Sequence, residues 1–377
     1  MDKSELPPSN LVFLIDVSGS MADQNKLPLL KSAFQLLVRE LRPKDRIAIV
    51  VYAGAAGLVL ESTRGNQKET ILNSLNKLQA GGSTAGGEGI KLAYKIAYSN
   101  FLTEGNNRII LATDGDFNIG SSSNAEMERL IETERGKGIF ITVLGFGMGN
   151  YKDDKMEIIA DKGNGNYAYI DNIQEARKIL VSEFAGTLFT IAKDVKFQLE
   201  FNPARVKAYR LVGYENRLLN DEDFNDDKKD AGEMGSGHTV TALYEIIPAG
   251  SDEAAGKIDP LKYQGNKNQV KVNQEAELLT VKLRYKQPEG VTSVLYENPV
   301  MGEVRQIDES SENFRFAAAV AEFGMVLRNS EYKNQASFKH LLSIAQNARG
   351  EDEEGYRGEF IKLVKTAQAL KGMSADK

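Results

Sequence analysis

The chain has 377 residues, enough for two domains of ordinary size, each with its own core. Its apolar fraction of 41% and charged fraction of 27% match those of globular proteins, which excludes wholesale disorder and a fibrous repeat. The net charge of -6, with both signs interspersed, argues against nucleic acid as a partner. The lack of cysteine excludes disulfides, thiolate metal sites and thiol nucleophiles.

The first half alternates short apolar runs with amphipathic segments. The apolar runs predict strands at 11–16, 47–52, 108–114 and 139–147. Helical spacing of apolar residues predicts helices at 26–41, 67–78, 89–100 and 124–135, and a closing helix at 172–192. An edge hairpin is expected from 47–52 and 58–62, with AGAAG as its turn. This alternation is typical of an α/β fold with a doubly wound, mostly parallel sheet.

The second half follows a different pattern. Apolar residues alternate with period two at 195–201, 240–247 and 278–285, which predicts antiparallel strands. The polar stretch 220–237 predicts a long hairpin loop. Three amphipathic segments, near 311–329, 334–348 and 355–370, predict helices whose apolar faces cover the β-rich part. We therefore expect two domains, an α/β domain at 8–192 and a β-rich, sandwich-like domain with C-terminal helices at 193–372.

Polar side chains alternate directly after the first predicted strand, as Asp16, Ser18 and Ser20. In an extended segment, residues two apart point the same way, so one carboxylate and two hydroxyls converge. Three converging oxygen donors indicate a hard cation. Asp16 also lies at the carboxyl end of its strand, where doubly wound sheets bind ligands.

Two further positions belong to the same expected edge of the sheet. Asp114 ends the run RIILATD and precedes a glycine, so it lies at another strand end. Thr84 lies in the loop GGSTAGG before the helix at 89–100, where small residues let the backbone approach closely. We therefore expect Asp16, Ser18, Ser20, Thr84 and Asp114 to form one metal site.

This set of residues resembles the metal-ion-dependent adhesion site of von Willebrand factor type A (VWA) domains, and the resemblance covers roughly residues 8–192. It implies that Ser18 and Ser20 bind Mg²⁺ directly, that Thr84 binds directly or through water, and that Asp16 and Asp114 act mostly through bound waters. Mn²⁺ or Ca²⁺ could replace Mg²⁺.

The ligand set predicts what such a site does. Mg²⁺ requires about six oxygen ligands and is rarely dehydrated completely. Because the hydroxyl ligands are neutral, the ion stays electrophilic and one coordination position is open to an Asp or Glu of another protein. We therefore expect a metal-dependent protein-binding or adhesion module and not an enzyme.

Residues 194–372 resemble the uncharacterised C-terminal domain that follows the VWA domain in bacterial proteins, many of them described as lipoproteins or as calcium-activated chloride channel homologues. The matching text lies at 216–246 and 310–332. The resemblance implies an extracytoplasmic protein, periplasmic or anchored at the cell surface. Residues 1–10 lack the apolar core of an export signal, and no stretch reaches the roughly 18 apolar residues of a membrane span, so channel activity is not expected.

Several alternatives remain open from the sequence. The protein could be a structural assembly component whose metal is bound in cis or by a second copy. It could be a metal-dependent hydrolase, for which Asp116 is the one candidate base. The acidic segment at 221–226 suggests a calcium loop, but it lacks glycine at the sixth position and glutamate at the twelfth, which is Gly232. His238 and His340 are expected to be structural or surface residues.

Overall fold

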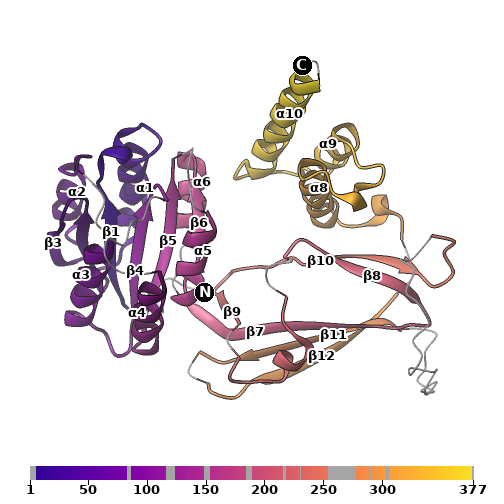
Figure 1. Cartoon of the computed structure of the whole chain (residues 1–377), viewed down its shortest axis with the longest axis horizontal. Helices are drawn as coiled ribbons and strands as arrows, with labels where there is room; N and C mark the ends of the chain where they lie inside the picture. Colours follow the sequence, from indigo (N-terminus) through magenta and orange to yellow (C-terminus); the bar gives the residue numbers. More distant parts are fainter. Residues whose placement is uncertain are drawn as a thin grey trace. The chain divides into compact units, whose positions relative to one another are not determined.

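The computed structural model (Figure 1) describes residues 6–82, 86–115, 124–147, 153–183, 189–214, 218–229, 231–253, 277–288, 290–302 and 305–375. Contacts within the chain cluster into two units. The first comprises 1–195, 230–239 and 285–292, and the second comprises 196–229, 240–284 and 293–377. The chain therefore passes from one unit to the other more than once.

The first unit contains a six-stranded sheet in the order β3-β2-β1-β4-β5-β6. Its strands are β1 (Ser9–Asp16), β2 (Arg46–Tyr52), β3 (Ala56–Arg64), β4 (Asn106–Thr113), β5 (Ile139–Phe146) and β6 (Tyr167–Ile170). All neighbours pair in parallel except β2 and β3, which form the predicted antiparallel hairpin. The carboxyl ends of the parallel strands therefore share one edge, and β1 lies between β2 and β4.

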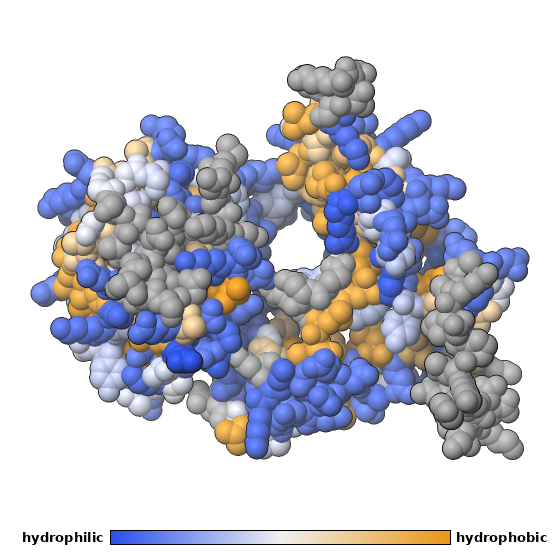
Figure 2. Space-filling model, in the orientation of Figure 1, coloured by the Kyte–Doolittle hydropathy of each residue, from blue (hydrophilic) through white to orange (hydrophobic). Residues whose placement is uncertain are grey.

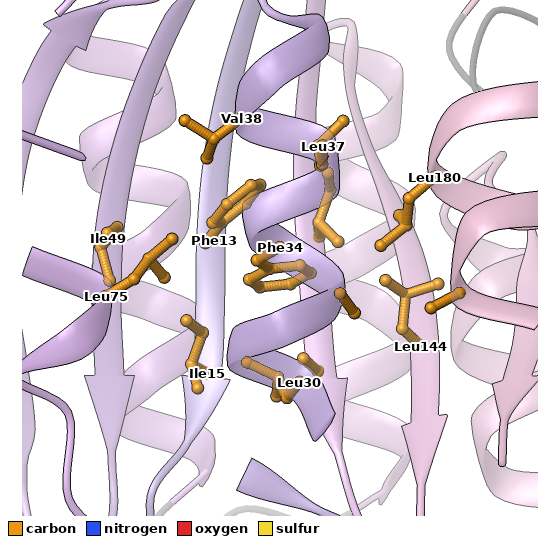
Figure 3. Close-up of a cluster of buried hydrophobic side chains, with 14 of the residues drawn as sticks. Phe13, Ile15, Leu30, Phe34, Leu37, Val38, Ile49, Leu75, Leu144 and Leu180 are labelled. Carbon is orange, nitrogen blue, oxygen red and sulfur yellow. The ribbon is translucent and has the colours of Figure 1, made fainter. Parts of the chain in front are cut away.

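Helices cover both faces of this sheet. They are α1 (Leu27–Glu40), α2 (Lys68–Asn76), α3 (Gly86–Ser99), α4 (Asn124–Gly136), α5 (Asp153–Lys162) and α6 (Ile173–Arg177), which continues as a π-helical turn, η2 (Lys178–Ser182). One core joins α1, α2 and α6 to the sheet, and another joins α3, α4 and α5 to the opposite face. In the first core the rings of Phe13 and Phe34 lie 4.1 Å apart (Figure 3). The doubly wound α/β prediction is confirmed.

Two predictions for this unit were incomplete or wrong. The sequence pattern did not predict α5 or β6. The helix expected at 172–192 ends at Ser182, and a strand, β7 (Thr190–Phe201), begins at Thr190. The prediction extended the helix too far because apolar residues at helical spacing continue as far as Thr190 and Ile191. These two residues are β-branched and belong to strand β7, which pairs with neighbouring strands.

The later strands form two sheets. β7 belongs to a four-stranded sheet in the order β12-β11-β7-β9, with β9 (Gly232–Gly235), β11 (Glu277–Lys286) and β12 (Val294–Met301). A separate antiparallel pair joins β8 (Val206–Val212) and β10 (Leu243–Pro248). The loop expected at 220–237 contains β9 and a short helix, η4 (Asp221–Phe224), and is thus more ordered than predicted.

The C-terminal helices are α8 (Glu312–Leu327), α9 (Phe338–Asn347) and α10 (Tyr356–Ala375). Their buried residues pack on one another: Phe323 and Val326 of α8 contact Leu341 of α9 and Val364 of α10. The expectation that their apolar faces cover the strands was therefore wrong, because three amphipathic helices can bury those faces mutually. A link to β8 runs through Arg210, whose guanidinium lies 4.2 Å from the ring centre of Tyr332.

The remaining short turns are η1 (Gly19–Ala22), η5 (Ile307–Glu309) and η6 (Glu331–Lys333). Figure 2 shows hydrophilic side chains interrupted by several apolar areas, one of them at the left edge, where Figure 1 places β3. Leu58 and Val59 are the exposed apolar residues of that strand. No helix in the described part of the chain combines the length and apolar character of a membrane span.

Residues 230–239 belong to the first unit although they follow β8 in sequence. The Nδ2 group of Asn164 donates a hydrogen bond of 3.2 Å to Oε1 of Glu233. Arg108 of β4 is 1% exposed and donates to Oγ1 of Thr142 at 2.8 Å. Burial lowers the pKa of Arg108 to about 10, and the negative charge of Glu233 opposes that decrease.

Candidate metal centre

Asp16 is the last residue of β1 and is completely buried. Its Oδ1 accepts a hydrogen bond of 2.8 Å from the backbone N–H of Ser18, and its Oδ2 accepts one of 3.4 Å from the hydroxyl of Thr113 on β4. Its register partner on β2 is Tyr52, which is also fully buried. The central position of β1 in the sheet thus fixes this carboxylate from both neighbouring strands.

The electrostatic environment of Asp16 opposes its ionisation. Burial raises the pKa of Asp16 to about 6, and the negative charge of Asp114 adds to the increase, while hydrogen bonds from Ser18 and Tyr52 reduce it. Burial and the charge of Asp16 together raise the pKa of Tyr52 well above 10, so its phenol stays protonated. An ionised Asp16 is therefore costly unless a positive charge lies beside it.

Ser18 and Ser20 follow Asp16 in the turn that contains η1. Their hydroxyl oxygens lie 3.0 Å apart. The backbone of the glycine-rich loop closes against this turn, because Gly19 N–H donates to the carbonyl of Gly82 at 3.0 Å and Gly81 N–H donates to the carbonyl of Val17 at 2.8 Å. Gly81 and Gly82 are thus anchored beside this turn. Thr84, two residues after Gly82, lies outside the described residues.

Asp114 follows the last residue of β4, and its side chain is 5% exposed. Its Oδ2 accepts a hydrogen bond of 3.0 Å from the ammonium of Lys26, which also donates to the backbone carbonyl of Ser20 at 3.0 Å. The structure therefore brings Asp16, Ser18, Ser20 and Asp114 to one edge of the sheet. Sequence reasoning missed Lys26, because no local pattern places its side chain beside Asp114.

These residues fit a divalent cation that prefers oxygen. In an octahedral site with bonds of about 2.1 Å, neighbouring ligand oxygens are about 3.0 Å apart. The two serine hydroxyls are hydrogen-bonded to each other at 3.0 Å, so both could bind one ion without moving apart. A buried carboxylate with an elevated pKa would be stabilised by the ion. Within the described ranges, no group of three or more His, Cys, Asp or Glu could hold a metal, so hydroxyls are needed to complete the set.

The acidic segment at 221–226 is contacted by the ammonium group of a buried lysine. The ammonium of Lys196, a residue that is 2% exposed, donates to the backbone carbonyls of Asp223 at 3.0 Å and Asp226 at 2.6 Å. Asp227 accepts from the hydroxyl and the backbone N–H of Ser293. The ammonium of Lys196 thus occupies backbone carbonyls of the acidic segment.

The structure gives both histidines contacts elsewhere in the chain. His340 contacts Glu322 of α8 through Nδ1 at 2.9 Å, next to the core of the C-terminal helices. The backbone N–H of His238 donates to the carbonyl of Gly235. Asp116, the candidate base of a hydrolase, lies outside the described residues.

Two protein-family models match the chain. The von Willebrand factor type A domain matches residues 10–181, and the model described as the C-terminal part of the uncharacterized protein YfbK matches residues 186–370. The uncharacterized protein YfbK of Escherichia coli (strain K12) is 46% identical over 370 residues, which are 98% of this chain and 63% of that relative. The chain therefore spans less than two thirds of this relative's length.

More distant proteins match the first part of the chain or, at low identity, most of its length. Inter-alpha-trypsin inhibitor heavy chain H3 of Homo sapiens is 25% identical over 174 residues, covering 44% of this chain and 18% of that protein. A solved von Willebrand factor type A structure from Catenulispora acidiphila is 18% identical, covers 95% of this chain and 82% of its own, and has a TM-score of 0.49.

Proposed function

Since the chain carries a VWA domain followed by a YfbK C-terminal domain, we propose that it is a metal-dependent protein-binding module. Its ion, Mg²⁺ in the first instance, binds an Asp or Glu of a protein partner. Asp16, Ser18, Ser20, Thr84 and Asp114 hold the ion, and no residue of the chain is assigned a catalytic role.

One observation carries the proposal: the carboxyl ends of β1 and β4 bring two acidic and two hydroxyl side chains together. Only two of these ligands carry a formal charge, and Lys26 offsets one of them. A divalent ion held there keeps a positive charge that attracts a carboxylate. Oxygen-only ligands favour Mg²⁺, Mn²⁺ or Ca²⁺ over softer metals.

We also propose an extracytoplasmic location, because residues 194–372 resemble domains of bacterial lipoproteins. This location determines where a partner is sought. Proteins of the bacterial envelope, with exposed acidic side chains, are the appropriate pool.

Metal binding is tested first, by isothermal titration of the full chain with Mg²⁺, Mn²⁺ and Ca²⁺. Ser18→Ala removes a proposed ligand and should weaken Mg²⁺ binding at least tenfold. Ser32→Ala is the matched control, because the Ser32 hydroxyl donates to the carbonyl of Pro28 within α1 and lies away from the strand ends. Equal affinities for the two variants would remove Ser18 from the site.

Partner binding is tested by capture from a bacterial envelope extract in Mg²⁺, in EDTA, and with Asp16→Ala. We expect a partner that is recovered only by the wild-type chain in Mg²⁺, and whose recovery falls when its acidic residues are amidated. Equal recovery of the same partner in all three conditions would refute a metal-bridged contact.

A further inference from the structure

Lys26 brings an ammonium group directly to the proposed metal site. Its Nζ donates to Oδ2 of Asp114 and to the backbone carbonyl of Ser20, each at 3.0 Å. The Lys26 and Asp114 side chains are 13% and 5% exposed, so this pair is largely shielded from water. Asp23, at 3.9 Å from the ammonium, is mostly exposed and is the weaker partner.

The chain fixes Lys26 from several elements. Lys26 is the N-cap residue of α1, with φ -119° and ψ -110°, and its N–H donates to the carbonyl of Asp23 at 3.0 Å. Its stem runs past Gly147 at the end of β5, where an added Cβ would lie 2.5 Å from Lys26 Cε. Gly147 has φ +86°, and its carbonyl accepts a hydrogen bond from the hydroxyl of Tyr169 on β6.

Lys26 therefore places a fixed positive charge next to the proposed metal ligands Asp114 and Ser20. The carboxylates of Asp16 and Asp114 carry two negative charges, and the Lys26 ammonium carries one positive charge. The described part of the site therefore has a net charge of one negative instead of two. An incoming divalent ion meets a repulsive charge and competes with the ammonium for Asp114. Even at the dielectric constant of water, a unit charge about 6 Å away changes the affinity for a divalent ion roughly tenfold.

We propose that Lys26 is a charge-regulating residue of the metal site, which weakens divalent-cation binding and leaves Asp114 when an ion binds. This inference rests on the proposed metal site and adds its regulation. The consequence is an ion that exchanges with solution instead of remaining permanently bound, so partner binding follows the supply of the cation.

The test is isothermal titration of the full chain with Mg²⁺ alone. Lys26→Met keeps most of the stem and removes the charge, and it should bind Mg²⁺ about tenfold more tightly than the wild type. Lys26→Arg keeps the charge and should bind like the wild type. Lys31→Met is the matched control, because Lys31 is on the same helix and donates to the carbonyl of Asn76. Unchanged or weaker binding by Lys26→Met overturns the proposal.

A second measurement needs no variant. The rate at which an amine-acetylating reagent modifies Lys26, followed by peptide mass spectrometry, should rise several-fold when Mg²⁺ is added, while the rate at Lys31 stays constant. An unchanged rate at Lys26 in saturating Mg²⁺ overturns release from Asp114.

These measurements distinguish an error in the proposed metal site from an error in the proposed role of Lys26. If the wild type and Lys26→Met both show no Mg²⁺ binding, or if Asp16→Ala binds as the wild type does, the proposed metal site itself is wrong. If Asp16→Ala loses binding and Lys26→Met does not gain it, the site stands and the role of Lys26 is refuted.

Discussion

Asp16 is the residue on which the site depends, because its carboxylate is buried at the end of the central strand β1. Such a group is more easily ionised in the unfolded chain than in the folded one. Its pKa of about 6 in the folded protein exceeds the ordinary value of 3.8. The folded state thus favours the protonated form of Asp16. The resulting contribution to the free energy of unfolding is fully present below pH 4 and is lost as the pH rises through about 6.

The raised pKa of Asp16 leads to a prediction about the pH dependence of stability in the metal-free protein. In EDTA, Asp16→Asn should gain stability relative to the wild type as the pH rises from 4 to 8, by about 3 kcal/mol in total. The asparagine oxygen can still accept from the Ser18 N–H, so the turn is retained. Denaturant midpoints at each pH provide the measurement. A difference between the two proteins that does not vary with pH would contradict the assigned pKa.

Residue patterns predicted which side chains meet at the strand ends, since alternation after a strand and a strand-end position are local features; that these side chains bind a metal stays a prediction. Asp16, Ser18, Ser20 and Asp114 were named in this way, and the structure brings them together. Lys26 was missed because its role comes from three elements that meet only in the folded chain: α1, the end of β4 and the end of β5.

At the scale of elements, the site depends on how closely α3 approaches the sheet. Gly89 of α3 lies against β1 and β2, and an added Cβ would be 2.8 Å from Cβ of Tyr52 and 3.2 Å from a methyl carbon of Leu14. A larger residue there would push the helix away from Tyr52, the neighbour of Asp16.

Gly89→Ala should therefore destabilise the first unit by roughly 1–3 kcal/mol through overpacking. Gly136→Ala, at the end of α4, is the control, because an added Cβ there has open space, and it should be neutral or slightly stabilising. Hydrogen exchange of peptides from β1 and β2 measures the effect within this unit. Equal protection from hydrogen exchange in the two variants would show that α3 can shift without destabilising the first unit.

The sequence predicted the elements of the first unit better than those of the second. Continuous apolar strands such as β1 and β4 are buried on both faces and give a strong local signal. β8 and β12 were not predicted, since their residues are mostly half-buried or exposed, with little apolar contrast. That the C-terminal helices pack on one another could not be read from their amphipathic patterns, which specify a buried face but not its partner.

At the scale of the whole molecule, the first unit is not a continuous stretch of sequence. Residues 230–239 and 285–292 cluster with residues 1–195. Through Glu233 the later segment provides a hydrogen-bond acceptor for Asn164 and a counter-charge for the buried Arg108. The predicted boundary between 192 and 193 would divide these contacts.

A chain truncated to residues 1–192 should therefore be less stable than the first unit of the full chain, by roughly 1–3 kcal/mol, because polar groups of the interior lose partners. Hydrogen exchange of β4 and β5 peptides in both chains is the measurement. Glu233→Gln in the full chain is the control, since it removes the charge and keeps the volume, and it should reproduce part of the loss. Identical protection in the truncated and full chains would make the later segment dispensable.

Lys196 has a consequence for how the molecule responds to its surroundings. Lys196 donates to the backbone carbonyls of Asp223 and Asp226, and Lys229 pairs with the carboxylate of Asp223 at 3.2 Å. Because these cations are covalently part of the chain, neither a chelator nor dilution can remove them. The proposed site near Asp16, in contrast, takes its ion from solution. On the proposed function, the supply of divalent ions therefore acts at the strand ends near Asp16, while the acidic segment at 221–226 keeps its lysine contacts.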